Sequence, residues 1–247
     1  LACYMAGFAL TTTPGKAGEA VRSIYLKQHD VPYSASLAAL FVERIADVIA
    51  VALIAIFGIA VFGDMKWLAW SALGGVVAAV ALLSHGAPER WARHWARRTN
   101  GRRARLALRG ADMLQSSRRL LSPQAALLGC VLGVVAWGAE AWAFAYLLEL
   151  LGYQIPVDLA AAIYALAILA GAASFLPGGI GGAEAAMALM LTSQGLTTPD
   201  AIAATLICRL CTLWLAVAIG AAFMLALSMP EPFGQGESVT SDKPEDR

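Results

Sequence analysis

Charged residues are scarce in this sequence, and their scarcity excludes water as the main solvent of the chain. Of the 247 residues, 14% are charged and 59% are apolar, against roughly 25% and 45–50% in soluble domains. Residues 67–83, 159–176 and 210–229 contain no charged residue. Apolar runs of roughly twenty residues are long enough to cross a bilayer as helices. The sequence therefore predicts an integral membrane protein made of helices.

The motifs of common enzyme classes are also absent. The sequence contains no glycine-rich nucleotide-binding loop, no His-Glu-x-x-His zinc motif and no Gly-x-Ser-x-Gly nucleophile motif. Its four cysteines lie in apolar stretches. Cys208 and Cys211 form a Cys-x-x-Cys pair without a second pair of ligands, which disfavours a metal or redox site. We therefore expect no metal, no cofactor and no enzymatic activity.

Arginine is concentrated in one stretch of the chain. Residues 84–124 contain ten arginines and only two acids, Glu89 and Asp112. Basic loops between spans stay on the cytoplasmic side, so we expect residues 85–124 to form a cytoplasmic loop of a multi-pass protein in the cell inner membrane. Basic stretches also bind nucleic acid, but a position between apolar segments favours a topological and lipid-surface role. We expect no nucleic-acid partner.

Apolar blocks and helix breakers divide the chain into segments. Long spans are predicted near 35–62, 66–84, 124–150, 157–176 and 198–228. Two segments, 15–29 and 182–194, are too short to cross the bilayer. Residues 1–229 are predicted to form one transmembrane domain. Residues 230–247 read as a disordered cytoplasmic tail. The first twelve residues resemble the end of a helix, so we expect further helices before them.

Each short segment follows a Pro-Gly break, TPGKAGEAVR at 13–22 and FLPGGIGGAEAAMAL at 175–189. Broken helices at membrane depth are tolerated where they line a protein cavity. Glycine also exposes backbone N–H groups at the start of a helix, where an anion binds well. The same residues serve equally to stop one helix and start the next. The break residues are Pro14, Gly15, Gly18, Pro177, Gly178, Gly179 and Gly181.

The two breaks begin an internal repeat. When Glu19 is aligned with Glu184, Arg44 falls opposite Arg209, because each arginine follows its glutamate by 25 residues. With the basic loop on the inside, the two copies run in opposite directions, so the repeat is inverted. Inverted repeats with paired interrupted helices point to a substrate site near the middle of the membrane. A duplication without a site is the alternative.

Charged residues inside the apolar spans are functional candidates, since a charge at the bilayer centre costs roughly 2.5–3.5 kcal/mol. Glu43, Arg44 and Asp47 lie close together in FVERIADVIAVAL at 41–53. They form either a self-neutralising pair that joins helices or a functional cluster that faces a lumen. Glu140 lies in the span 124–150, where it either pairs with Arg44 or Arg209 or accepts a proton in coupling.

Arg209 requires a partner from another segment. The repeat indicates Glu184, whereas the anionic part of a substrate is the alternative, because a guanidinium binds phosphate well. Lys16 and Arg22 add positive charge at the first break, which suits a phosphate headgroup. The candidate headgroup contacts are Lys16, Glu19, Arg22, Arg44, Glu184 and Arg209.

Taken together, these motifs resemble those of a known family. TPGKAGEAVR, FVERIADVIAVAL and FLPGGIGGAEAAMALMLTSQGLTTPDAIAATLICRL are similar, in this order, to the motifs of the lysylphosphatidylglycerol synthase transmembrane (flippase-like) family. The resemblance extends to residue 228 and implies a lipid translocator. Two-part members carry a separate aminoacyltransferase domain that does not match this chain, so synthase activity is not implied. The matching positions are Pro14, Gly15, Gly18, Glu19, Arg22, Glu43, Arg44, Asp47, Pro177, Gly178, Gly181, Glu184 and Arg209.

The sequence thus predicts an all-α, polytopic transmembrane bundle with two short interrupted helices in inverted repeats. We expect it to translocate or present an anionic or isoprenoid-type lipid across the inner membrane. One alternative is an accessory or intramembrane enzyme of lipid modification or lipid-linked glycosylation, with Glu140 or Asp47 as its base. Another is a scaffold whose charges only pair internally. Membrane lipids are the expected partners, and the formation of a homo-oligomer is left open.

Overall fold

The computed structural model describes residues 2–13, 22–27, 30–61, 86–99, 101–120, 123–174 and 176–228, with the isolated positions 70, 74 and 78. These parts of the chain are helical apart from short connections and contain no strand. The predicted all-α fold class is therefore confirmed. The span predicted at 66–84 and the tail at 230–247 fall outside the described ranges, and of the short segment at 15–29 only α2 lies within them.

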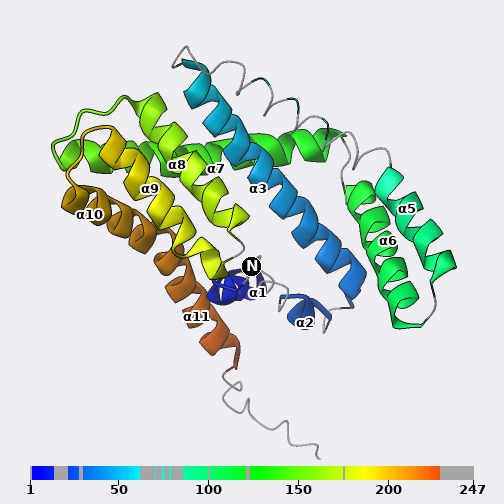
Figure 1. The fold of residues 1–247 in the computed structure, drawn as a ribbon. Coiled ribbons are helices and arrows are strands. Elements are labelled where there is room, and N and C mark those ends of the chain that lie inside the picture. The colour runs from blue at the N-terminus through cyan, green and yellow to red at the C-terminus, as the bar shows by residue number, and fades with distance from the viewer. Residues whose placement is uncertain are drawn as a thin grey trace, which may run out of the picture.

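Figure 1 shows the order of the elements. The first half of the chain comprises α1 (Ala2–Gly7), η1 (Phe8–Leu10), α2 (Arg22–Lys27) and α3 (Tyr33–Val61). A basic hairpin, α5 (Ala87–Arg98) and α6 (Arg102–Leu120), leads into α7 (Pro123–Leu150). The second half comprises α8 (Val157–Ala173), η3 (Pro177–Gly179), α9 (Gly182–Ser193), α10 (Thr198–Arg209), the π-helical turn η4 (Leu210–Trp214) and α11 (Leu215–Ser228).

The predicted boundaries agree with these helices to within a few residues. The spans at 35–62, 124–150 and 198–228 correspond to α3, α7 and the continuous α10–α11, and the short segment at 182–194 corresponds to α9. The span predicted at 157–176 is shorter, because α8 stops where the second break begins. Hydrophobic length and helix breakers therefore locate these elements. They did not predict α5 and α6, which form within the stretch expected to be a basic loop, because these helices are too polar to give an apolar block.

Within the described parts of the chain, two helices are long and apolar enough to cross a membrane. They cover Leu127–Leu150 and Thr198–Leu227. The α3 helix, with 29 residues, is comparably long but carries Glu43, Arg44 and Asp47. The α8 helix is uncharged after its first turn and shorter, with 17 residues. The fold therefore combines two candidate spans, α7 and the continuous α10–α11, with a long helix that also carries charged residues.

The first half turns from α2 into α3 through a left-handed residue. Asp30 has a φ of 61° and is the one non-glycine residue with positive φ among those described. Its N–H binds the carbonyl of Lys27 at 3.2 Å, and the N–H of Val31 binds the carbonyl of Leu26 at 3.2 Å. This pair of bonds is the Schellman closure of a helix C-terminus.

The second half makes the same turn from α9 into α10. Gly195 takes the left-handed position with a φ of 92°. Its N–H binds the carbonyl of Thr192 at 3.1 Å, and the N–H of Leu196 binds the carbonyl of Leu191 at 3.3 Å. Gly195 is the residue that the repeat aligns with Asp30. The repeat inferred from the side chains is therefore also present in the backbone.

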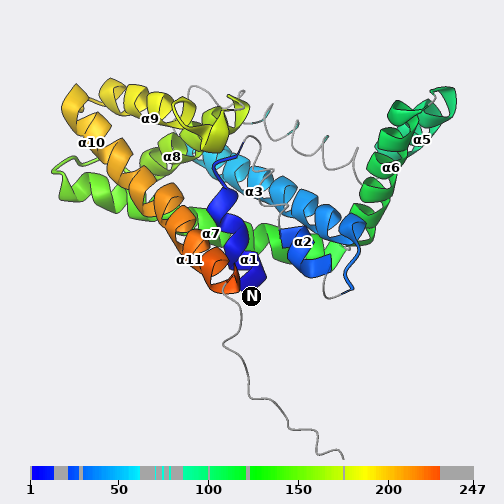
Figure 2. The same cartoon turned by 90° about the horizontal axis from the view of Figure 1, so that it is seen from below.

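The two halves are also arranged as an inverted pair. Figures 1 and 2 show α3 and the continuous α10–α11 running in opposite directions. Their first residues, Tyr33 and Thr198, are aligned by the repeat. The halves exchange equivalent contacts, since α1 and η1 pack on α11 whereas α8 packs on α3. This exchange is what a two-fold relation between the halves produces, as the inverted-repeat hypothesis requires.

The apolar core lies among α7, α8, α9 and α10. Its fully buried side chains include Phe144, Leu148, Tyr164, Met187 and Leu191. The outward faces of the long helices carry many exposed apolar residues instead. Such a surface is costly in water but favourable in a bilayer, where lipid tails are as apolar as leucine.

Candidate functional site

The second Pro-Gly break has a backbone that only glycine adopts easily. Gly178, Gly179 and Gly181 have φ values of 63°, 67° and 88°, in the left-handed region. Gly179 also lies against α8, where an added Cβ would be 3.1 Å from the backbone of Gly171. The break therefore reverses direction in close contact with α8.

An ion pair fastens this break to α10. Nε of Arg209 donates to Oε1 of Glu184 at 2.6 Å, and Nη2 of Arg209 donates to the carbonyl of Gly178 at 2.8 Å. Arg209 is buried, with 7% of its side chain exposed. The partnership between Arg209 and Glu184 predicted from the repeat is confirmed.

Glu184 also occupies the start of α9. Its Oε2 accepts a hydrogen bond from the N–H of Gly181 at 2.6 Å, so the carboxylate caps the helix in which it stands. A negative charge in the first turn is favoured by the helix dipole. At this break, the helix start therefore binds the chain's own carboxylate. Among the N–H groups at this break, that of Gly181 is therefore occupied by the chain itself.

The α10 helix changes to a π-helical turn directly after Arg209. The turn η4 covers five residues before α11 resumes regular geometry. Isolated π-helical turns are rare and occur mainly at functional sites. Here the turn places Cys211 and Thr212 at a cavity described below.

A second cluster of charges joins α3 to α7. Nη2 of Arg44 contacts Oδ2 of Asp47 at 3.1 Å within α3. Oδ1 of Asp47 accepts a hydrogen bond from the indole Nε1 of Trp137 in α7 at 3.1 Å. All three side chains are half-buried, as is Glu43 one turn before Asp47. Of the two alternatives for this cluster, the structure shows the contact of Arg44 with Asp47, and Trp137 is a partner that the sequence did not indicate.

Replacing Trp137 by phenylalanine is expected to lower the free energy of unfolding by about 1.5 kcal/mol, because a hydrogen bond to a charged group is lost. Unfolding by SDS in mixed micelles, followed by circular dichroism, measures this change. The matched control is Trp142→Phe on the same helix, since Trp142 is 63% exposed and stacks on Tyr146. Equal effects of the two substitutions would contradict a role for the bond to Asp47.

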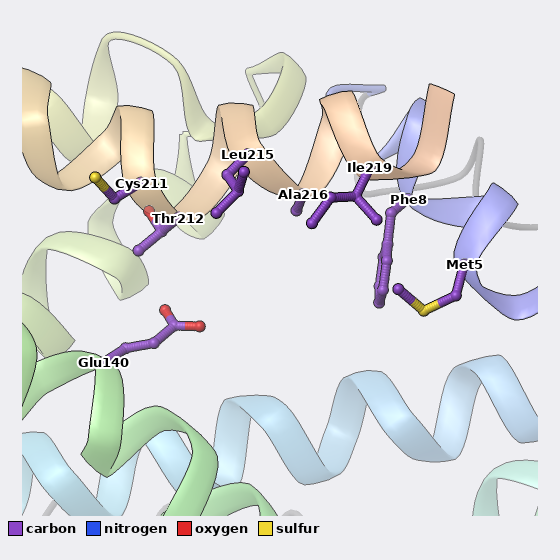
Figure 3. Close-up of a pocket in the computed structure, with 8 residues that line it drawn as sticks. All are labelled: Met5, Phe8, Glu140, Cys211, Thr212, Leu215, Ala216 and Ile219. Atoms are coloured by element: carbon purple, nitrogen blue, oxygen red, sulfur yellow. The ribbon is translucent and has the colours of Figure 1, made fainter. Parts of the chain in front are cut away.

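A cavity of about 220 Å³ lies between α7, α11 and the N-terminal α1–η1 segment (Figure 3). Glu140 enters it from α7, and its carboxylate points toward Thr212 of the π-helical turn. Glu140 is the one charged residue among the described lining residues. The other lining residues are Met5, Phe8, Cys211, Thr212, Leu215, Ala216 and Ile219.

Glu140 is held by a tyrosine, not by an arginine. It accepts a hydrogen bond from the hydroxyl of Tyr164 in α8, and Tyr164 is fully buried. The expected pairing of Glu140 with Arg44 or Arg209 is therefore corrected, because these arginines contact Asp47 and Glu184. The hydroxyl of Tyr164 carries no positive charge, so this hydrogen bond does not neutralise the carboxylate of Glu140 as an arginine would.

At the first break, the described residues are those of the segments on either side. Arg22 is the first residue of α2, and Thr12 precedes the break. The Cα of Thr12 would be 3.3 Å from a Cβ on Gly178, so the chain enters the first break directly beside the second. The candidates that lie outside the described residues are Pro14, Gly15, Lys16, Gly18 and Glu19.

These features define an all-α membrane protein built from two inverted halves, with ion pairs inside the bundle and one carboxylate in a cavity. The chain belongs to the family of the lysylphosphatidylglycerol synthase TM region, whose family model matches residues 1–220. It has no significant match among curated proteins or among solved structures. The family match confirms the resemblance carried by the motifs and links the chain to lipid modification or translocation.

Proposed function

We propose that this chain translocates or presents a membrane lipid, and that the lipid headgroup binds beside Glu140. The observation that carries the proposal is a single carboxylate in a cavity with otherwise apolar or neutral walls. A charged side chain within a membrane span is costly, so it is a functional candidate by default. The apolar walls suit the glycerol and acyl parts of a lipid, and the carboxylate suits a cation or hydrogen-bond donor.

The charges that are paired indicate which headgroup fits. Arg209 is buried against Glu184 and Gly178, and Arg44 contacts Asp47. Two of the arginines that we expected to bind an anionic headgroup, Arg44 and Arg209, therefore already contact carboxylates of the chain. Glu140 supports instead a phospholipid whose headgroup carries an ammonium group. The family description names lysylphosphatidylglycerol, a lipid with this property.

The surrounding architecture supports movement of the lipid more than chemistry on it. Two inverted halves with interrupted helices are the arrangement that alternates access in many transporters. The cavity also lies where the two halves exchange contacts, because α1–η1 belongs to the first half and α11 to the second. A relative movement of the halves would change the shape of this cavity.

A lipid-scrambling assay in proteoliposomes tests the proposal. Lysylphosphatidylglycerol with a fluorescent acyl chain is reconstituted into both leaflets. Added dithionite destroys the fluorescence of lipid in the outer leaflet, so further loss reports lipid that has moved there. Labelled phosphatidylglycerol is measured in the same way for comparison. We expect Glu140→Gln to slow movement of the ammonium-bearing lipid by roughly tenfold, equivalent to about 1.4 kcal/mol, with a smaller effect on phosphatidylglycerol. The matched control is Glu149→Gln, since Glu149 is an exposed acid on the same helix outside the cavity.

The outcomes separate the alternatives. If the native chain moves neither lipid, translocation is wrong. If Glu140→Gln slows both lipids equally, a charge-selective headgroup site is wrong. Mass spectrometry of the recovered lipids completes the test, because a chemically altered lipid would assign Glu140 the role of a base and favour the intramembrane enzyme.

A further inference from the structure

The hairpin of α5 and α6 stands apart from the rest of the bundle. Figures 1 and 2 show it at the end of the molecule opposite α9 and α10, turned away from the line of α7. The hairpin is attached to the bundle through α6, which packs on α3, and α5 packs on α6. Since α7 follows α6 and contains a candidate span, the hairpin lies at one end of that span. This end is where membrane meets water.

The two acids of the hairpin both contact Arg93, and the contact with Asp112 joins its two helices. Nε of Arg93 in α5 contacts Oε1 of Glu89 at 3.2 Å. Its Nη2 contacts Oδ1 of Asp112 in α6 at 3.1 Å and donates to Oε1 of Gln115 at 3.0 Å. These contacts make the hairpin a preformed unit. They also direct both acids toward Arg93, so the remaining arginines of the hairpin outnumber the acids on its outer surface.

The outer face of α5 combines exposed indoles with positive charge. Trp91 and Trp95 are 69% and 41% exposed. They lie one turn apart and are therefore neighbours on the helix surface. His94 and Arg98 are exposed on the same side of the helix. The exposed arginines of the hairpin are Arg90, Arg97, Arg98, Arg102, Arg103 and Arg105.

We propose that this face of the hairpin docks on anionic phospholipid headgroups of the membrane that holds the chain. Tryptophan is favoured at the level of the headgroups, and arginine is attracted to anionic lipids. A helix with both features lies in the plane of the interface. A soluble acidic partner would match the arginines, but the position at the end of a span brings the indoles to lipid first. The docking concerns the hairpin alone and does not depend on the cavity.

Quenching of a fluorescent label by brominated lipid tests the docking in the full chain. A single cysteine replaces His94, and the four native cysteines are replaced by alanine. The labelled protein is reconstituted either with brominated phosphatidylcholine alone or with added brominated phosphatidylglycerol. We expect quenching of the label to be roughly fivefold stronger when phosphatidylglycerol is present. High salt should reduce this difference, because screening shortens the range of the attraction. A label at Gln194→Cys, exposed at the end of α9, is the positional control.

Two variants identify the groups responsible. Arg97→Gln combined with Arg98→Gln should remove most of the phosphatidylglycerol dependence, and Trp91→Ala should reduce quenching in both kinds of vesicle. All three residues are exposed, so these changes leave the fold intact. Equal quenching in the two kinds of vesicle would overturn the proposal. Protection of the label from quenching by an added RNA oligonucleotide would also overturn the proposal, and it would assign the face to nucleic acid.

Discussion

Replacing Arg209 by alanine is expected to lower the free energy of unfolding by roughly 3–5 kcal/mol, the cost of removing one partner from a buried ion pair. Glu184 would keep its charge inside the bundle, and the N–H of Gly181 would be its one remaining donor among the residues that the structure describes. The carbonyl of Gly178 would also lose its bond to Nη2. Unfolding by SDS in mixed micelles, followed by circular dichroism, measures the loss.

Two further variants show whether burial decides the size of the effect. Arg44→Ala removes the arginine that the repeat aligns with Arg209, but Arg44 and Asp47 are 26% and 30% exposed. We expect it to cost about 1 kcal/mol, because this pair is less buried and joins two residues of the same helix. Arg209→Lys keeps the charge but not the two-pronged geometry, so its cost should lie in between. Equal losses for Arg44→Ala and Arg209→Ala would contradict the structural role assigned to the buried pair.

The pair of Glu184 and Arg209 was predictable because two kinds of sequence signal agree on it. A charge in an apolar span requires a partner, and the repeat proposes one at a fixed spacing. The boundaries of α7, α9 and α10 were predictable for a similar reason, since hydrophobic length and Pro-Gly breaks act locally along the chain. Such signals do not require knowledge of which helices touch.

The bond between Glu140 and Tyr164 could not be obtained in this way. Tyr164 carries no charge and lies in an apolar run, so charge complementarity indicated arginines as the partners of Glu140. The one available signal was the tyrosine hydroxyl itself, because a buried hydroxyl also needs a partner. The cavity depends further on the approach of α1–η1 to α11, which joins residues from opposite ends of the sequence.

The turn at Asp30 shows a further limit of the sequence. A left-handed position after a helix favours glycine, and Gly195 follows this rule in the second half. The first half uses Asp30 at the aligned position. Aspartate adopts the left-handed conformation more readily than most other residues. The two copies therefore conserve a backbone conformation and not a residue type, so the turn itself was not part of the predicted repeat.

Replacing Gly220 by alanine is expected to lower the free energy of unfolding by about 3 kcal/mol, at the upper end of the usual cost of overpacking. An added Cβ would lie 2.1 Å from the backbone nitrogen of Ala9 and 2.5 Å from the carbonyl carbon of Phe8. Backbone atoms cannot rotate away as a side-chain tip can, so α1–η1 would have to move from α11. Because Phe8 lines the cavity with Glu140, lipid movement should fall together with stability.

Gly138→Ala in α7 is the matched control for this substitution. A Cβ at Gly138 would have no neighbour within 4 Å, so the higher helix propensity of alanine should stabilise the protein by roughly 0.5–1 kcal/mol. The same unfolding titration and the same lipid-scrambling assay compare both variants with the native chain. If Gly220→Ala behaves like Gly138→Ala in both measurements, α1–η1 does not pack on α11 in the membrane. The cavity would then be open on that side, and a headgroup site beside Glu140 would have to be formed by α7 and α11 alone.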